Sequence, residues 1–130
     1  MKLNLVKFGS GCVLYIVTLL GGWDIALQTL LIVMILDYTT GVLKGWHTKQ
    51  LSSAIGARGI VKKIMYLLLI VLVNQIGIMI GDVNGSTRKI VIFFFVSNEG
   101  ISILENAKLM DIKLPNVLYK MMDALKEGSE

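Results

Sequence analysis

The chain alternates long apolar runs with short polar clusters, and four runs are long enough to be candidate membrane spans. They are Phe8 to Trp23, Ile25 to Leu43, Ile64 to Ile80 and Ile90 to Leu104. A helix rises 1.5 Å per residue and needs about 20 residues to cross a hydrocarbon core of ~30 Å. The second run meets this length and the third comes close, whereas the first and fourth are short. The pattern predicts an all-α integral membrane protein with about four transmembrane helices, and three spans are the alternative.

The polar segments between these runs predict how the helices are connected. A hairpin at Gly21 to Asp24 joins the first two runs, and another at Asp82 to Thr87 joins the last two. A longer polar link from Gly45 to Gly59 separates the second run from the third. Ser52 and Ser53 in this link are typical of a turn or a helix start.

Composition agrees with a lipid environment. Hydrophobic residues make up 55% of the chain and charged residues only 17%, and the mean hydropathy is +0.71. The formal net charge of +4 would suggest a nucleic-acid partner in a soluble domain, but these cations flank apolar runs, so we expect none. The single cysteine, Cys12, excludes an intramolecular disulfide. No small-residue cleavage site follows the first run, which predicts a retained helix rather than a signal peptide.

Lysine and arginine are unequally divided between the two sides of a four-span arrangement. Eleven lie on the side of the termini and only Arg88 and Lys89 lie on the other. The positive-inside rule therefore predicts that both termini are cytoplasmic. The middle link contributes three of the orienting cations: Arg58, Lys62 and Lys63.

The chain changes character near its C-terminus. Leu114, Val117, Leu118, Met121 and Leu125 recur at helical spacing among charged residues. This pattern predicts a short amphipathic helix that lies on the inner leaflet or packs against a partner copy, and packing in a cytoplasmic cap is the alternative. We therefore divide the chain into a transmembrane helical domain, 1–110, and a cytoplasmic amphipathic tail, 111–130.

Charged residues inside the runs are informative, because a charge in the hydrocarbon core costs at least ~2.5 kcal/mol. Asp37, Thr40, Gly41 and Lys44 share one face of the second run at helical spacing. This face indicates a helix contact or a pore-lining stripe. The alternative is an interfacial Asp37 neutralised by Lys44 or by a loop cation.

The fourth run carries a polar stripe in its second half. At 100° per residue its members fall within an arc of roughly 120°, and they are Asn98, Glu99, Ser102, Glu105 and Asn106. We expect the stripe to face water or other helices, including those of neighbouring subunits. The alternative is a shallow helix whose second half has already left the membrane.

The third run offers a weaker association signal. Asn74 can form interhelical hydrogen bonds, and Gly77 and Gly81 form a small-xxx-small pattern that permits close helix approach. No catalytic constellation or metal-ligand spacing is present in the sequence, so we expect neither an enzyme nor a cofactor.

Three segments together resemble the toxin secretion and phage lysis holin family of Gram-positive bacteria and their phages. They are Leu36 to Lys44, Ser52 to Lys63 and Asn98 to Asn106. The chain departs from the family pattern after Asn106, where Asp111 and Lys113 replace a glycine and a small residue before the proline.

The resemblance implies a small protein that assembles with itself in the bacterial cytoplasmic membrane. Holins open lesions there that let an endolysin reach the cell wall or let a toxin leave, so membrane lipids, further copies and such a cargo are the implied partners. Two other classes fit the residues alone: a small ion channel or transporter subunit that uses the intramembrane carboxylates, and a scaffold that recruits partners through its basic loop.

Overall fold

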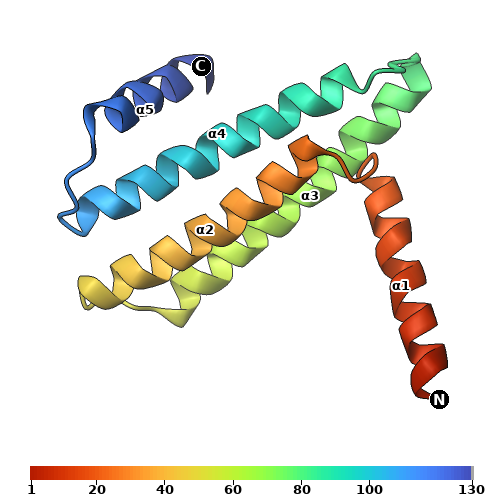
Figure 1. Cartoon of the computed structure of the whole chain (residues 1–130), viewed down its shortest axis with the longest axis horizontal. Coiled ribbons are helices and arrows are strands. Elements are labelled where there is room, and N and C mark those ends of the chain that lie inside the picture. Colours follow the sequence, from red (N-terminus) through yellow and green to blue (C-terminus); the bar gives the residue numbers. More distant parts are fainter. Residues whose placement is uncertain (130) are drawn as a thin grey trace.

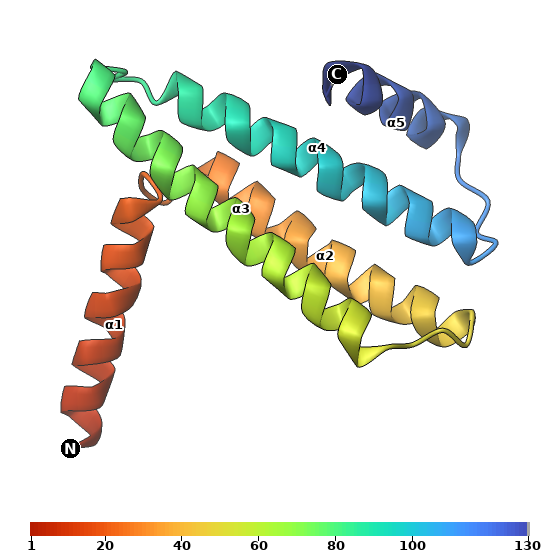
Figure 2. The same cartoon turned by 180° about the vertical axis from the view of Figure 1, so that it is seen from behind.

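The structure is a computed structural model, and it describes residues 1–129. Five helices and no strands occupy this part of the chain. They are α1 (Lys2–Leu19), α2 (Ile25–His47), α3 (Ser53–Ile80), α4 (Ser86–Leu109) and α5 (Asn116–Ser129). Helices α2, α3 and α4 form an antiparallel bundle, α1 extends away from it, and α5 turns back beside α4 (Figures 1 and 2).

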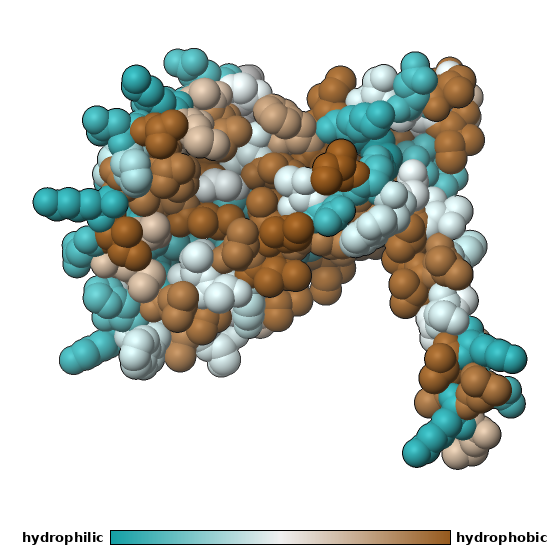
Figure 3. Space-filling model, viewed as in Figure 1, coloured by the Kyte–Doolittle hydropathy of each residue, from teal (hydrophilic) through white to brown (hydrophobic). Residues whose placement is uncertain are grey.

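The first four helices are long enough and apolar enough to cross a membrane, which confirms the predicted all-α membrane class. Few of their side chains are buried within the monomer, and α1 has none. Apolar residues cover much of the visible surface, while hydrophilic ones gather at the end bearing the α2–α3 loop, toward the hairpin end and at the N-terminal tip of α1 (Figure 3). Lipid is the solvent that suits such a surface.

Local capping residues determine where the helices begin. Asp24 accepts a hydrogen bond from the backbone of Leu27 at 2.9 Å and so starts α2. Ser52 caps α3 in the same way. The carboxylate of Asp82 accepts from Ser86 and Thr87 at the start of α4, and these hydrogen bonds lower the pKa of Asp82 below its usual value.

Two predicted boundaries were wrong. The first run was expected to continue to Trp23, but α1 ends at Leu19 because Gly21 and Gly22 adopt positive φ angles of 92° and 98°. The polar link expected from Gly45 to Gly59 is largely helical, because α2 continues to His47 and α3 begins at Ser53. The short polar stretch after Gly56 therefore belongs to the first turns of a helix.

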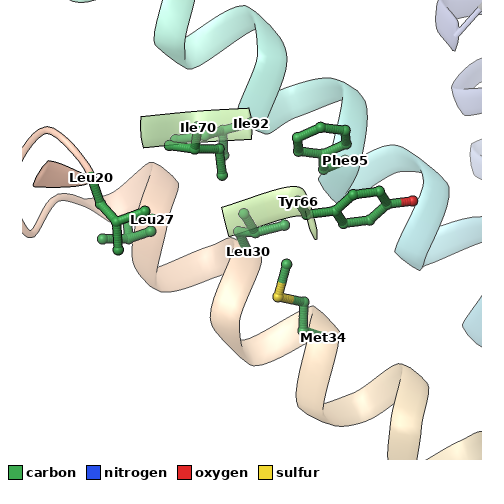
Figure 4. Close-up of a cluster of buried hydrophobic side chains, with 8 residues drawn as sticks. All are labelled: Leu20, Leu27, Leu30, Met34, Tyr66, Ile70, Ile92 and Phe95. Carbon is green, nitrogen blue, oxygen red and sulfur yellow. The ribbon is translucent and has the colours of Figure 1, made fainter. Parts of the chain in front are cut away.

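The apolar core lies between α2, α3 and α4 in the half of the bundle near the two hairpins. Leu30 and Met34 of α2 belong to one buried cluster with Ile70 of α3, and the rings of Tyr66 and Phe95 stack with centroids 4.0 Å apart (Figure 4). Such aromatic pairs contribute about 1 kcal/mol beyond their buried area. This core separates the hairpin end of the bundle from the half that contains the buried charges.

The tail predicted for 111–130 folds against the rest of the chain. In α5, Met122 is 7% exposed against α4 and Leu125 packs beside Gly100. Leu118 and Leu125 lie on the packed face, whereas Val117 and Met121 are exposed. The amphipathic helix thus has a docking surface inside its own chain, and Glu130 lies outside the described residues.

Candidate functional site

Three charged side chains from three helices meet inside the bundle. The ammonium Nζ of Lys63 on α3 lies 2.7 Å from Asp37 Oδ2 on α2 and 2.5 Å from Glu99 Oε2 on α4. Glu99 is fully buried, and the side chains of Lys63 and Asp37 are only 13% and 16% exposed. We call these three residues the ion-pair cluster.

The three members lie at one level because of where each occurs along its helix. Asp37 is ten residues before the end of α2, Lys63 is ten residues after the start of α3, and Glu99 is ten residues before the end of α4. The helices alternate in direction, so each residue lies about 15 Å from the end of the bundle that carries the α2–α3 loop. That depth is inside the membrane for helices of this length.

The charges of the cluster do not balance. Two carboxyl groups share one ammonium group, and the second carboxyl oxygen of Glu99, Oε1, is buried without any hydrogen-bond partner. Removing ionised groups from water is costly unless they are paired and hydrogen-bonded. The cluster is therefore stabilised by its geometry but carries an unsatisfied atom.

Polar contacts continue from the cluster toward the α2–α3 loop. The amide of Asn106 on α4 donates a hydrogen bond to the hydroxyl of Thr40 on α2 at 3.0 Å, and that hydroxyl donates to the carbonyl of Asp37. Gly41 lies beside the Asn106 amide. A polar seam thus joins α2 to α4, whereas Leu30 and Ile92 join them by apolar contact nearer the hairpins.

A cavity of about 240 Å³ opens between the loop-side ends of α2, α3 and α4. Asp37, Lys63 and Ser102 lie on its wall, and Lys44 lines it as well. Glycines on α2 and α3 contribute no side chains to the space, and they are Gly41, Gly45, Gly56 and Gly59. The cavity places the cluster in reach of water from the loop side.

A second polar network holds the opposite end of the bundle. Arg88 of α4 is buried, donates to the carbonyls of Leu20 and Gly22, and pairs with Asp24 at 2.6 Å. The amide of Asn74 donates to the carbonyl of Leu19. Arginine suits this position because its fork of donors reaches several oxygens at once. These contacts hold the end of α1 and the hairpin after it.

Arg88 also influences the chemistry of the hairpin. Its hydrogen bond to Asp24 holds the pKa of that carboxyl below its usual value, and the bond from the Leu27 backbone acts in the same direction against desolvation. Gly21 packs against the guanidinium and the Asn74 side chain so closely that no Cβ fits. The hairpin therefore requires glycine at this position for space as well as for its positive φ.

The predicted polar stripe on α4 divides between two partners. Glu99 and Asn106 face α2 and α3, and Ser102 borders the cavity. Glu105 was expected to share this environment, but it is exposed and pairs with Lys126 of α5 at 3.8 Å. Asn98 is half-buried and forms no contact with the cluster that the structure records. Glu99 thus finds its partner within the monomer, without a neighbouring subunit.

Other candidate residues have local roles. The alternative for Asp37 was neutralisation by Lys44 or by a loop cation; Lys63 pairs with Asp37, and Lys44 lines the cavity. Gly81 ends α3 in a left-handed conformation. Gly77 packs beside the side chain of Asp82, the residue that follows Gly81. These contacts leave the small-xxx-small pattern at a helix end. Within residues 1–129 no group of side chains is placed to hold a metal ion.

Sequence reasoning missed the roles of two cations. Lys63 was interpreted as an orienting cation with Arg58 and Lys62, and Arg88 was counted only as an outer loop charge. Lys62 does remain at the surface, with its ammonium 5.4 Å from the Tyr66 ring centroid. The available signal for Lys63 was its distance from Ser52: a helix that starts at this cap places Lys63 three turns inside the span.

Comparisons with known proteins agree with this architecture. The model of the bacteriophage holin family matches residues 14–127. A probable holin of Bacillus phage phi105 is 31% identical over 80% of this chain and 76% of its own length. An uncharacterised 14.9 kDa protein of Clostridium perfringens is 37% identical over 96% of this chain and 93% of its own length.

Listeria innocua has a further uncharacterised relative, Lin0175, which is 38% identical over 100% of this chain and 91% of its own length. No solved structure matches the fold. The family match extends from the middle of α1 to α5, and so includes the ion-pair cluster and the contacts of Arg88 with the α1–α2 hairpin. The chain belongs to the bacteriophage holin family.

Proposed function

We propose that this protein is a holin that assembles with itself in the bacterial cytoplasmic membrane and opens lesions through which an endolysin or a secreted toxin passes. The observation that carries the proposal is the buried ion-pair cluster between α2, α3 and α4. Family membership supports it. No catalytic role, cofactor or nucleic-acid partner is part of the proposal.

The cluster gives the monomer a closed form and an open one. While α2, α3 and α4 stay together, Lys63 contacts one oxygen of each carboxyl group and the lipid contacts mainly the apolar outer faces. If α4 separates from α2, the polar seam of Thr40 and Asn106 is exposed as well. Such faces are costly in lipid but suitable for lining water, so several open copies around a lesion stabilise one another.

The orientation follows from the positions of the loops. The α1–α2 and α3–α4 hairpins lie at one end of the bundle, and the α2–α3 loop and the α4–α5 turn lie at the other (Figure 1). Even when the buried Lys63 is left out, the second end carries six cations and the hairpin end carries two, Arg88 and Lys89; the six are Lys44, Lys49, Arg58, Lys62, Lys108 and Lys113. We place this end and both termini in the cytoplasm.

Release of a folded enzyme tests the proposal. The chain is expressed in a bacterium, and escape of a cytoplasmic enzyme and of potassium are followed together. We expect both to escape from cells with the parent chain. Glu99→Leu should reach the membrane in the same amount but release the enzyme later, because the open form of α4 then presents an apolar side chain where a carboxyl group would line water. Glu105→Leu is the matched control, because Glu105 pairs only with α5, and it should behave as the parent.

A small ion channel or transporter subunit is the second candidate, and the cavity that reaches the cluster favours it. A channel of that kind admits ions but no folded protein. Escape of potassium without enzyme would therefore support the channel and contradict the holin. If cells with Glu99→Leu released the enzyme as cells with the parent chain do, the cluster would have no part in lesion formation.

A further inference from the structure

We propose that the ion-pair cluster binds a proton, which the carboxyl groups of Asp37 and Glu99 share and which arrives through the cavity at the loop side of the bundle. Proton binding here does not depend on lesion formation, because the closed monomer already contains every group that it requires. The site is formed by one residue from each of α2, α3 and α4.

The charge count is the first observation. With both carboxyl groups ionised, two negative charges oppose one positive charge, and among residues 1–129 no cation other than Lys63 pairs with either carboxyl group. An excess charge at this depth costs at least ~2.5 kcal/mol. One bound proton makes the cluster neutral. Because Asp37 and Glu99 contact the same ammonium, their carboxyl groups are close neighbours, and two such groups cannot both ionise readily.

The second observation is the unpaired oxygen of Glu99. Oε1 is buried without a hydrogen-bond partner, while Oε2 accepts from Lys63. A bare carboxylate oxygen in such a site leaves a negative charge unsolvated, whereas a protonated carboxyl group is neutral there. A proton on Glu99 thus removes the least solvated negative charge of the cluster, and Asp37 is the member nearest to water.

Access to the cluster is one-sided. Asp37 and Lys63 border the cavity, and Glu99 lies behind them. About one turn from the cluster toward the hairpins, the three helices carry Met34, Tyr66 and Phe95, which belong to the buried apolar core (Figure 4). Protons therefore exchange with the side that carries the α2–α3 loop, and this side is the cytoplasm in the orientation proposed above.

The other ionisable groups near the cluster are few. On α2, Tyr38 and Lys44 line the cavity beyond Asp37. On α3, Lys62 turns to the Tyr66 ring at the surface. On α4 and α5, Glu105 and Lys126 pair with each other on the exposed side. None of them supplies a second ammonium group in contact with the two carboxyl groups.

Infrared spectroscopy of the purified full-length chain tests the proposal. In alkyl maltoside micelles, which contain no carbonyl group, the carbonyl stretch of a protonated carboxyl group is separate from the carboxylate bands. At neutral pH we expect a band equivalent to one such group per chain, which shifts in heavy water. Asp37→Asn and Glu99→Gln should each abolish it, because either change balances the charges. Glu105→Gln is the control and should keep it.

The parent spectrum is decisive by itself, so the test does not depend on the folding of any variant. Absence of the band from the parent would overturn the proposal, since the cluster would then hold two ionised carboxylates. Persistence of the band in both Asp37→Asn and Glu99→Gln would also overturn it, because the proton would lie elsewhere. Helical amide bands in the same spectra report whether each variant is folded.

Discussion

Lys63 is the side chain on which charge pairing inside the bundle depends. It is the sole cation of the cluster and contacts both carboxyl groups within hydrogen-bonding distance. Removing one partner from a buried ionic network leaves the others unpaired, which costs more than the pair itself contributes. Lys62 is adjacent in sequence but has an exposed ammonium above the Tyr66 ring. The two lysines therefore provide a matched comparison.

We expect Lys63→Met to destabilise the folded chain by about 3 kcal/mol, because Asp37 and Glu99 lose their shared partner. Lys62→Met should cost less than about 1 kcal/mol, the value of an exposed cation–π contact. Unfolding of the purified variants in mixed micelles measures both. Equal losses for the two variants would mean that the cluster contributes nothing specific to stability.

The pair of Asp24 and Arg88 should make the hairpin sensitive to acid. Arg88 holds the pKa of Asp24 below its usual value of 3.8, so the pair stabilises the folded hairpin above that value and is lost as the pH falls through the lowered pKa. We expect hydrogen-exchange protection at Leu20 to Asp24, corrected for intrinsic rates, to stay constant from about pH 7 to about pH 4.5 and to fall only below that.

Asp24→Asn should remove this acid transition and weaken protection of the hairpin at every pH. Lys89→Met, one residue beyond the buried Arg88, should keep the transition, because Arg88 makes the direct contacts. Loss of protection in the parent well above pH 5 would show that another group controls the hairpin.

At the residue scale the sequence identified the carboxylates but not their partner. Asp37 and Glu99 stand out because charge is rare in apolar helices. Helical periodicity places residues on a face of their own helix, but it does not say which faces of different helices meet. For that reason Lys44, two turns from Asp37 on the same face, was weighed as the partner beside an unspecified loop cation, and Lys63 from α3 was not distinguished from the surface cations beside it.

At the scale of helices, the pattern of hydrophobicity predicted which helices exist and in what order, but not the residues at which each begins and ends. The helices continue past the apolar runs into polar residues, since hydrogen bonding and caps such as Ser52 determine where a helix starts. Glycines with positive φ ended α1 earlier than its hydrophobicity suggested. The docking of α5 was harder to predict, because an amphipathic face fits a membrane surface as well as another helix.

We expect the contact between α5 and α4 to depend on Met122, which is 7% exposed, rather than on Met121, which is 53% exposed. Met122→Ala should lower the free energy of opening α5 by about 2 kcal/mol, as for a buried methionine, whereas Met121→Ala should change it by less than about 0.5 kcal/mol. Hydrogen exchange along α5 measures this. Equal exchange in both variants would mean that α5 does not stay docked on α4 in micelles.

At the scale of the whole molecule, the bundle has an apolar half near the hairpins and a polar half near the α2–α3 loop. α1 is attached at the hairpin end through the Arg88 network and buries no residue of its own. The contacts that hold the bundle shut in its polar half are the ion-pair cluster and the bond between Thr40 and Asn106. The proposed lesion therefore requires α2 and α4 to separate on that side.

A chemical crosslink between α2 and α4 tests this requirement most directly. In a Cys12→Ser chain, Thr40→Cys and Asn106→Cys replace two residues whose side chains are in contact, and a short membrane-permeant reagent bridges the two thiols in expressing cells. A control pair, Ile76→Cys and Ile80→Cys, lies one turn apart on the exposed part of α3 and is bridged within a single helix. We expect the bridged α2–α4 pair to stay in the membrane and release no cytoplasmic enzyme, while the same pair without reagent and the bridged control both release it. Release from the bridged α2–α4 pair at the rate of the unbridged pair would contradict the proposal that the bundle must open.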